Sequence, residues 1–305
     1  MNTRHAQLVL AVVREGSFTA AAKSLFVTQP TLSQQIRQIE QQLGQPIFER
    51  STTPVSLTPA GQIYVQSARR FLQIEAQMNE SLAALSGRQT GLLRLGLPMQ
   101  RADELLPQVL PEFQSAYPDV RLQAVSARNN ALEAGLLGGE LDMALLFGEA
   151  ENEKLDYQLI ASDEVILVAG RKTALAQRVP SGSTVSLSAC EGEKFVLPAE
   201  NLPFARKYDE LFARAALSPF VALRTDDSQC AKRVCAACSL VMLCPFITLL
   251  SDTSAMQQLA HYRLSDAFYT PLYMAHPKDM PLTPYAQTLY TIMSNRFRAM
   301  TAYRL

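Results

Sequence analysis

A long helical segment near the start of the chain most restricts how the sequence can fold. The pattern begins at Thr58 and Pro59 and continues to about Ser86, which makes it far longer than the helices predicted around it. This segment should pack lengthwise on a second helix, because apolar residues recur every seven positions along it. They are Tyr64, Phe71, Met78 and Leu85. We therefore expect a dimer contact here, and a helix that lies on its own domain is the alternative.

The composition is that of a globular protein with more than one domain. A chain of 305 residues exceeds one ordinary core, so two or three domains are expected. Hydrophobic residues make up 48% and charged residues 18%, which predicts no long disordered part. No stretch approaches the roughly 20 apolar residues that span a bilayer, and the N-terminus lacks the apolar core of a signal peptide. The expected location is the cytoplasm, with no membrane partner.

Three short helical patterns precede the long helix. The first ends at Gly16, and Ser17 is suited to cap the second. The third is expected over residues 29–43, between a cap at Thr28 and a stop at Gly44. Its apolar side should be buried and consists of Leu32, Ile36, Ile39 and Leu43. Residues 46–57 are extended and rich in turn formers, which predicts a short two-stranded wing.

Charge is spread unevenly, although the chain as a whole is neutral. The 28 basic residues equal the 28 acidic residues in number, which excludes a uniformly basic coat for nucleic acid. Residues 1–74 nevertheless contain seven basic and three acidic side chains. This excess is a modest electrostatic footprint of the kind that nucleic-acid-binding domains carry.

After a hinge at residues 87–91, strand patterns alternate with helical patterns. Helices are expected at residues 105–117 and 130–137. Strands are expected at residues 92–97, 120–125, 143–147, 165–169, 194–197, 220–224, 241–243 and 272–275. Such alternation predicts an α/β domain with mostly parallel sheets flanked by helices.

Several stretches of the sequence resemble the LysR-type family of transcriptional regulators. They are GSFTAAAKSLFVTQPTLSQQIRQIEQQLGQPIFER and SLTPAG near the N-terminus, and LRLGLPM, LLPQVLPEFQSAYPDVRL and GGELDMALL farther on. The resemblance implies an all-α winged helix-turn-helix head at residues 1–58, a dimerising linker helix and hinge at 59–90, and an effector-binding domain at 91–305. That domain would be built like a periplasmic solute-binding protein, with one α/β subdomain at about 91–163 and 267–305 and the other at about 164–266.

The third helix is the expected DNA-reading element. Opposite its apolar side lie short polar groups and a guanidinium, which suit base edges and phosphates in a major groove. These residues are Gln29, Pro30, Thr31, Ser33, Gln34 and Arg37. The resemblance adds Arg50 and Thr52 of the wing, which would contact the DNA backbone or a minor groove. Since each head carries few positive charges, we expect a homodimer or homotetramer on double-stranded promoter DNA, with RNA polymerase as a further candidate partner.

A ligand cleft is expected between the two subdomains. Ligands of open α/β sheets bind beyond the C-terminal ends of the strands, where helix N-termini point. Three such segments should line the cleft, with ordinary turns as the alternative interpretation: Met99 with Gln100, Pro198 with Asn201, and Thr225 with Ser228. Family members often have Ser or Thr near position 100 to meet a carboxylate, whereas this chain offers an amide. The uncharged lining favours a polar organic effector over an inorganic ion.

The cysteines raise an alternative function. Five cysteines, an odd number in a chain without an export signal, argue against a disulfide framework. Four of them lie within fifteen positions, namely Cys230, Cys235, Cys238 and Cys244. A thiol-redox or metal-responsive regulator is therefore the alternative to packing as small hydrophobic residues. We favour packing, because no histidine lies nearby and the spacing of the second pair does not fit a zinc site.

Enzyme motifs are absent from the sequence. None of the three histidines, His5, His261 and His276, stands in a known catalytic context. We expect no catalytic activity, no cofactor and no metal. The expected function is sequence-specific binding of promoter DNA that changes transcription when a small molecule binds.

Overall fold

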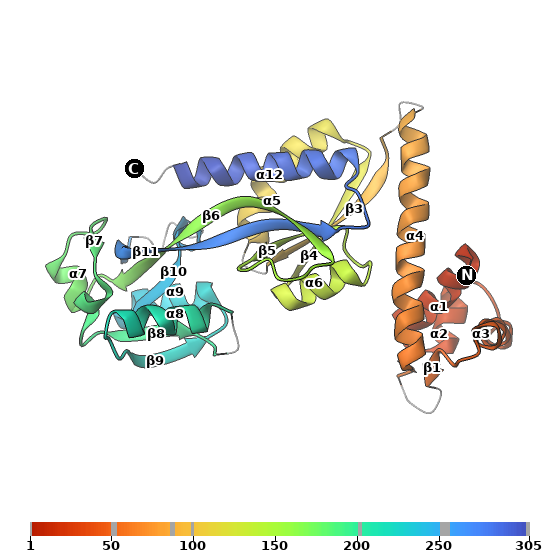
Figure 1. Cartoon of the computed structure of the whole chain (residues 1–305), viewed down its shortest axis with the longest axis horizontal. Helices are drawn as coiled ribbons and strands as arrows, with labels where there is room; N and C mark the ends of the chain where they lie inside the picture. Colours follow the sequence, from red (N-terminus) through yellow and green to blue (C-terminus); the bar gives the residue numbers. More distant parts are fainter. Residues whose placement is uncertain are drawn as a thin grey trace.

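The protein consists of a helical head, one long helix and a large α/β domain, which follow one another along the chain (Figure 1). This arrangement confirms the predicted fold class. The computed structural model describes residues 2–49, 54–85, 89–98, 101–200, 203–250 and 257–302. Within these ranges no helix is both long and apolar enough to cross a membrane.

The head contains three short helices, α1 (Thr3–Glu15), α2 (Phe18–Ser24) and α3 (Gln29–Leu43). Their ends are those that the sequence predicts. The Ser17 and Thr28 hydroxyls each accept a hydrogen bond from the backbone amide three residues later, as N-caps do. Gly16 and Gly44 end α1 and α3 with φ angles of 61° and 74°, in the left-handed region that favours glycine.

One side of each helix packs into a common apolar core. The core includes Leu32, Ile36 and Ile39 of α3, as predicted. Leu43 is an exception, since the sequence predicts a buried side chain and the structure shows an exposed one. It is the last residue of α3, and the chain turns away from the core at the next position.

A two-stranded antiparallel wing follows α3, formed by β1 (Phe48–Glu49) and β2 (Ser56–Leu57). The Glu40 carboxylate of α3 accepts hydrogen bonds from the amides of Ile47 and Phe48, at 2.9 and 3.3 Å. At the other end of the wing, the Thr58 hydroxyl accepts a hydrogen bond from the amide of Gly61 at 2.9 Å. The wing is thereby tied both to α3 and to the helix that follows.

The long helix α4 (Pro59–Leu85) completes the head core with its first turns. Tyr64, Val65 and Ala68 are buried there, together with residues of α1 to α3. The prediction that places Tyr64 on a seam between two chains is therefore wrong, because the head of its own chain covers this side chain.

Another side of α4 exposes a row of large apolar residues. They follow helical spacing over much of the helix and are Ile63, Phe71, Ile74, Met78 and Leu82. Phe71 and Met78 belong to the predicted seam, and the side chain of Leu85 lies outside the described part. We call these five residues the apolar row.

The α/β domain is built on one nine-stranded sheet with the order β4-β3-β5-β11-β6-β10-β8-β9, in which β7 pairs with β11. The strands on one side are β3 (Gly91–Pro98), β4 (Val120–Ala127) and β5 (Met143–Phe147). Those on the other side are β7 (Thr184–Val185), β8 (Lys194–Pro198), β9 (Phe220–Thr225) and β10 (Val241–Pro245). The long strands β6 (Leu155–Gly170) and β11 (Leu259–Pro277) join the two sides.

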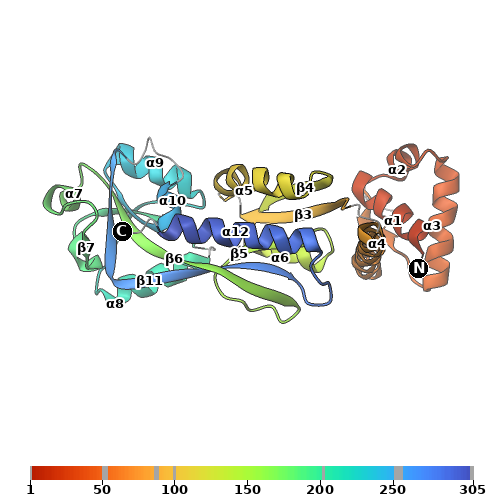
Figure 2. The same cartoon turned by 90° about the horizontal axis from the view of Figure 1, so that it is seen from above.

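Five of the eight strand pairings in this sheet among the described residues are parallel, in agreement with the prediction, whereas the three that join β6 with β10, β5 with β11, and β6 with β11 are antiparallel. The sequence does not predict the long antiparallel pairing of β6 with β11. These strands run antiparallel over most of their length, from Leu155 against Pro277 to Gly170 against Leu259. β10 is also antiparallel to β6, and β5 to β11, whereas the outer strands pair in parallel. The reason is topological: the chain leaves one half of the domain along β6 and returns along β11 (Figure 2).

Helices pack on the sheet and form two separate apolar cores with it. The first core joins β3 and β5 with α5 (Ala102–Ala116) and α12 (Pro284–Ala302), and α6 (Asn129–Leu137) packs nearby. The second joins β8 and β10 with α7 (Ala174–Arg178), a 3-10 turn (Leu187–Cys190) and α8 (Pro203–Arg214). α9 (Ser228–Cys238) and α10 (Phe246–Leu250) lie beside the second core. We call the half around the first core lobe I and the half around the second core lobe II.

The apolar row generates a prediction about assembly. Replacing both Phe71 and Met78 with Glu should lower the mass of the particle in solution, because carboxylates cannot be buried in an apolar contact without partners. Light scattering on the full chain measures this mass. Gln62→Glu, an exposed change on the same helix, is the control and should leave it unchanged. An unchanged mass in the double variant would mean that the contact between chains lies elsewhere.

Candidate DNA-binding surface and ligand cleft

The first two turns of α3 present a polar surface to solvent. Five of the predicted DNA-binding residues are exposed there, and a sixth, Ser33, is half-buried: the exposed ones are Gln29, Pro30, Thr31, Gln34 and Arg37. The Gln29 side-chain amide donates a hydrogen bond to the Ser33 hydroxyl at 3.0 Å, which orients both side chains on one face. This face offers amide, hydroxyl and guanidinium groups, the chemistry that recognises base edges and phosphates.

The wing stands next to this surface because Glu40 of α3 binds its first amides. Sequence reasoning missed Glu40, although a glutamate inside an otherwise amide-rich helix is a visible signal. The other two predicted DNA-binding residues, Arg50 and Thr52, lie outside the described residues.

The positive charge of the N-terminal part is smaller on the head surface than its sequence suggests. Arg14 pairs with the neighbouring Glu15 at 3.0 Å. Arg69 and Arg70 of α4 pair with Glu140 and Asp279 of lobe I, at 2.6 and 2.9 Å. Three of the seven basic residues counted in the sequence thus already have carboxylate partners.

Part of the predicted cleft comes together at the C-terminal ends of β8 and β9. Pro198 and Thr225 end these neighbouring parallel strands and lie opposite each other in the register. Ser228 begins α9 directly afterwards, and its hydroxyl oxygen is buried without a hydrogen-bond partner. The remaining predicted cleft residues, Met99, Gln100 and Asn201, lie outside the described residues.

A buried ion pair that the sequence analysis missed lies between the lobes. Arg101, at the start of α5, is 4% exposed, and its Nη2 is 3.8 Å from Oδ2 of Asp163, in the middle of β6. The guanidinium also stacks over the ring of Phe147, with 5.0 Å between Cζ and the ring centroid. Asp163 accepts a hydrogen bond from the amide of Ile247 at 3.3 Å. The sequence signal that could have revealed this ion pair is the presence of two adjacent acidic residues, Asp163 and Glu164, inside an otherwise apolar strand.

Further polar groups surround this ion pair. The ammonium of Lys232 is fully buried and donates to the carbonyl of Thr248 at 2.9 Å. Burial raises the pKa of the Cys244 thiol to about 12; the charge of Asp163 adds to this rise, whereas Lys232 and Arg101 oppose it. Cys244 is therefore neutral at physiological pH.

The hydroxyl of Thr270 is a second buried group without a partner. Thr270 lies opposite Asp163 in the pairing of β11 with β6, so their side chains share one face of the sheet. Buried hydroxyls are nearly always hydrogen-bonded in proteins. Ser228 and Thr270 thus offer two unused polar groups on the side of the molecule where the lobes meet.

Two exposed ion pairs connect the lobes directly. Arg128, before α6, pairs with Asp226, before α9. Lys207 of α8 pairs with Glu149, which follows β5, at 3.3 Å. Since each pair has one member in either lobe, the structure shows the lobes in mutual contact.

The cysteines divide into buried and exposed groups. Cys190, Cys235 and Cys244 are buried, whereas Cys230 and Cys238 are exposed on α9. All five are free thiols. Across the described ranges, no three histidine, cysteine or acidic side chains are grouped so as to hold a metal ion.

Comparisons with known proteins agree with this architecture. The chain matches two described families: the LysR substrate binding domain over residues 86–298, and the bacterial regulatory helix-turn-helix protein, lysR family, over residues 3–62. An uncharacterized HTH-type transcriptional regulator, YybE of Bacillus subtilis (strain 168), is 28% identical over 72% of this chain and 74% of its own. A probable RuBisCO transcriptional regulator of Gracilaria tenuistipitata var. liui is 33% identical over 53% of each chain, so this chain matches about half of that relative.

Solved structures share the fold over nearly the whole chain. Full-length BenM is 26% identical, with a TM-score of 0.58 over 99% of this chain and 98% of its own. Full-length CbnR in complex with its target DNA is 23% identical, with a TM-score of 0.66 over 97% and 99%. A full-length single-site variant of OxyR from Pseudomonas aeruginosa is 20% identical, with a TM-score of 0.75 over 98% and 95%. With both family matches in place, the chain belongs to the LysR family of DNA-binding transcriptional regulators.

Proposed function

We propose that this regulator binds promoter DNA sequence-specifically through the start of α3 and changes transcription when a small molecule binds between lobes I and II. The observation that carries the proposal is the exposed polar face of α3, next to a wing, in a member of the LysR family. In this proposal residues 1–58 bind DNA, residues 59–90 link and dimerise, and residues 91–305 bind the effector.

The DNA-binding residues have distinct proposed roles. Gln29, Pro30, Ser33 and Gln34 lie on the first turns of α3, the part of a recognition helix that enters the major groove most deeply. Arg37, one turn farther on, is assigned to a phosphate. The remaining assignments are Thr31 at the groove edge, and Arg50 and Thr52 of the wing at the DNA backbone or a minor groove.

Several heads must act together in this proposal. The head carries few unpaired positive charges, and one weakly charged head supplies little of the electrostatic affinity on which DNA binding depends. Linking heads converts the second binding event into an intramolecular one. We therefore propose a dimer through the apolar row of α4, and a tetramer through the effector domains, with RNA polymerase as a candidate partner at the promoter.

The effector is proposed to be a small polar organic molecule that carries an anionic group. Pro198, Thr225 and Ser228 line one side of its site, and the buried Arg101 lies on the other. The buried guanidinium of Arg101 favours an effector with an anionic group, because hydrogen bonds between a guanidinium and an anion are strong. The sequence alone predicts only a polar organic molecule. Binding would shift the population between arrangements of the lobes, which requires different affinity for each arrangement.

The DNA proposal predicts a loss of base discrimination in one variant. Gln34→Ala should reduce the preference for the target sequence by about 1 to 3 kcal/mol for each base pair that Gln34 reads, because an amide can contact an adenine edge in two places. Gln42→Ala, an exposed change near the far end of α3, is the control. Footprinting and binding titrations on the promoter of the gene itself measure the effect. A wild-type protein that protects no promoter sequence would refute the proposed function.

The effector proposal predicts stabilisation by acids. In thermal-shift measurements on the full chain, some members of a panel of small carboxylic acids should raise the melting temperature, and their primary amides should not. Ser228→Ala should reduce the shift, because it removes a buried hydroxyl that would form a hydrogen bond with the bound acid. Ser115→Ala, exposed on α5, is the control. Equal stabilisation of the Ser228 variant and the parent would show that the site is assigned wrongly.

The two interpretations of the cysteines predict different thiol reactivity. Packing predicts unreactive buried thiols, whereas the redox alternative requires reactive ones. Burial raises the pKa of the Cys190 and Cys244 thiols to about 12 and also raises that of Cys235. The thiolate is the reactive form, so these three should resist a maleimide at pH 8 while Cys230 and Cys238 react. Mass spectrometry of the native protein reports the modified sites. Rapid modification of Cys235 or Cys244 would revive the redox alternative.

A further inference from the structure

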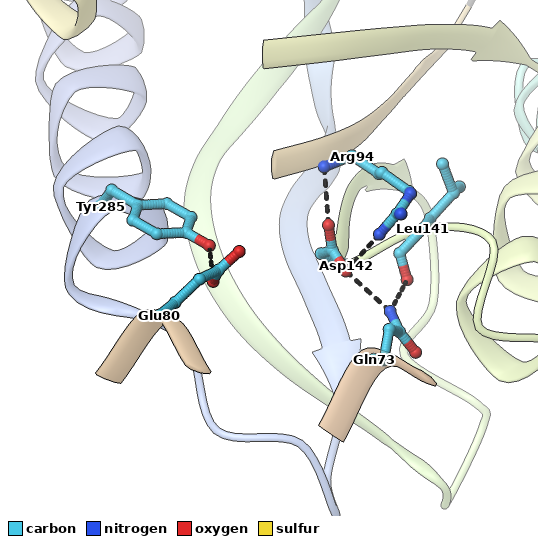
Figure 3. A network of polar contacts seen from close by, with 6 residues as sticks. All are labelled: Gln73, Glu80, Arg94, Leu141, Asp142 and Tyr285. Atoms are coloured by element: carbon cyan, nitrogen blue, oxygen red, sulfur yellow. Dashed lines mark hydrogen bonds and ion pairs between the residues drawn. The ribbon is translucent and has the colours of Figure 1, made fainter. Parts of the chain in front are cut away.

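The linker helix α4 is held against lobe I of its own chain by a network of polar contacts (Figure 3). At its centre, the Gln73 side-chain amide donates a hydrogen bond to Oδ1 of Asp142 at 2.7 Å. The other carboxylate oxygen of Asp142 accepts a hydrogen bond from the backbone amide of Arg94 at 2.7 Å. Gln73 is buried by this contact, and the carboxylate thus joins α4 to the start of β3.

Contacts on either side extend the network along the helix. The Gln66 side-chain amide donates to the carbonyl of Leu137 at 2.8 Å, and the ion pairs of Arg69 and Arg70 with lobe I lie beside it. Toward the other end, the hydroxyl of Tyr285 on α12 donates to the carboxylate of Glu80 (Figure 3). These α4 residues are spaced by three, four or seven positions, so they form one face of the helix. We call this face the lobe-facing row; it consists of Gln66, Arg69, Arg70, Gln73 and Glu80.

Two glycines allow the backbones to approach. A Cβ on Gly139, in the turn after α6, would lie 3.0 Å from Oε1 of Gln73 and 3.3 Å from the backbone nitrogen of Arg70. A Cβ on Gly91, at the start of β3, would lie 2.9 Å from the carboxylate of Glu80 and 3.0 Å from the hydroxyl of Tyr285. Lobe I is therefore shaped to receive the lobe-facing row at both ends of the contact.

The contact is held by polar pairs and does not merge with an apolar core. Among the described residues, those of α4 that join a core belong to the head, and none joins a core of either lobe. Between α4 and lobe I there is a cavity of about 30 Å³, room for about one water molecule. Its lining includes apolar side chains such as Leu92, Met280 and Leu282 as well as polar ones. The polar groups that pair here can pair with water instead, which lowers the free-energy cost of opening the contact.

We propose that the lobe-facing row and lobe I form a reversible lock that sets the orientation of the DNA head relative to the effector domain, with the Gln73–Asp142 hydrogen bond at its centre. The open and closed states of this lock would give the head different orientations, and thereby relate the arrangement of the lobes to DNA binding. This role rests on the proposed function. Asp142 directly precedes β5, and Arg94 lies within β3. These strands end at Phe147, over which Arg101 stacks, and at Pro98, three positions before Arg101. A rearrangement of lobe I is thereby transmitted to α4.

The test is Gln73→Glu in the full-length chain. It places a second carboxylate against Asp142 and removes the donated hydrogen bond, so hydrogen exchange in residues 66–85 and 137–142 should become about tenfold faster. Exchange is followed by mass spectrometry on the protein without DNA. Gln62→Glu adds the same charge to an exposed site of α4 and should leave exchange unchanged.

A second substitution tests the geometry itself. Adding Asp142→Asn to Gln73→Glu exchanges the amide and the carboxylate, so the hydrogen bond can form in the reverse direction while the new amide oxygen still accepts from Arg94. This double variant should restore slow exchange. Light scattering on each variant verifies that the particle mass is the same, so that a change in exchange reports the lock and not the contact between chains.

Half-exposed ion pairs provide a second test that leaves Gln73 and Asp142 unchanged. Arg69→Glu with Arg70→Glu should open the lock, and adding Glu140→Arg with Asp279→Arg should close it again. The proposal is overturned if Gln73→Glu and the double arginine variant both exchange like the parent, or if the paired exchanges fail to restore protection. Failure of the proposed function would appear differently, as a wild-type protein that leaves no footprint on its promoter whatever its exchange rates.

Discussion

The antiparallel pairing of β6 with β11 is the interaction on which the rest of the effector domain depends. These two strands carry the chain into lobe II and back, and they are shared by the sheets of both lobes. Their register shifts twice, between Arg263 and Phe268 and between Leu272 and Tyr273. Asp163 and Thr270 lie between these shifts, so the polar groups that face Arg101 are placed on the segment where one lobe passes into the other. Any movement of the lobes must be accommodated by this ribbon, so the proposed ligand site lies beside the pivot.

The helix α4 combines three separate tasks because its period of 3.6 residues presents different faces to different neighbours. Tyr64 and Ala68 complete the core of the head, the apolar row is exposed, and the lobe-facing row binds lobe I through polar groups. The first contact is part of an apolar core, whereas the last is made of hydrogen bonds and ion pairs. In the proposed lock, α4 stays packed in the head while its lobe-facing row is released, so the helix transmits a change of angle from the effector domain to the head.

Much of this architecture could be predicted from the sequence where local signals are strong. Caps and stops such as Ser17, Thr28 and Gly44 placed the head helices correctly, and β5 was predicted at its observed bounds. The first parts of β6 and β11 were missed, because they mix apolar, polar and charged residues without an apolar run or strict alternation. Tyr64 was misplaced because a heptad spacing does not say which neighbour covers it. Arg101, Asp163 and Lys232 escaped prediction because their burial arises from segments far apart in the chain.

The pairing of Arg69 and Arg70 with lobe I has an electrostatic consequence for the head. While Glu140 and Asp279 neutralise these guanidinium groups, they are not available to displace counterions from a nucleic-acid backbone. Separation of α4 from lobe I would return two positive charges to the surface beside the head. Since the logarithm of DNA affinity falls with the logarithm of salt concentration by about 0.9 for each phosphate neutralised, the slope of that dependence would be steeper for the separated arrangement. Ionic strength and effector would then both act on DNA affinity through the charges of Arg69 and Arg70.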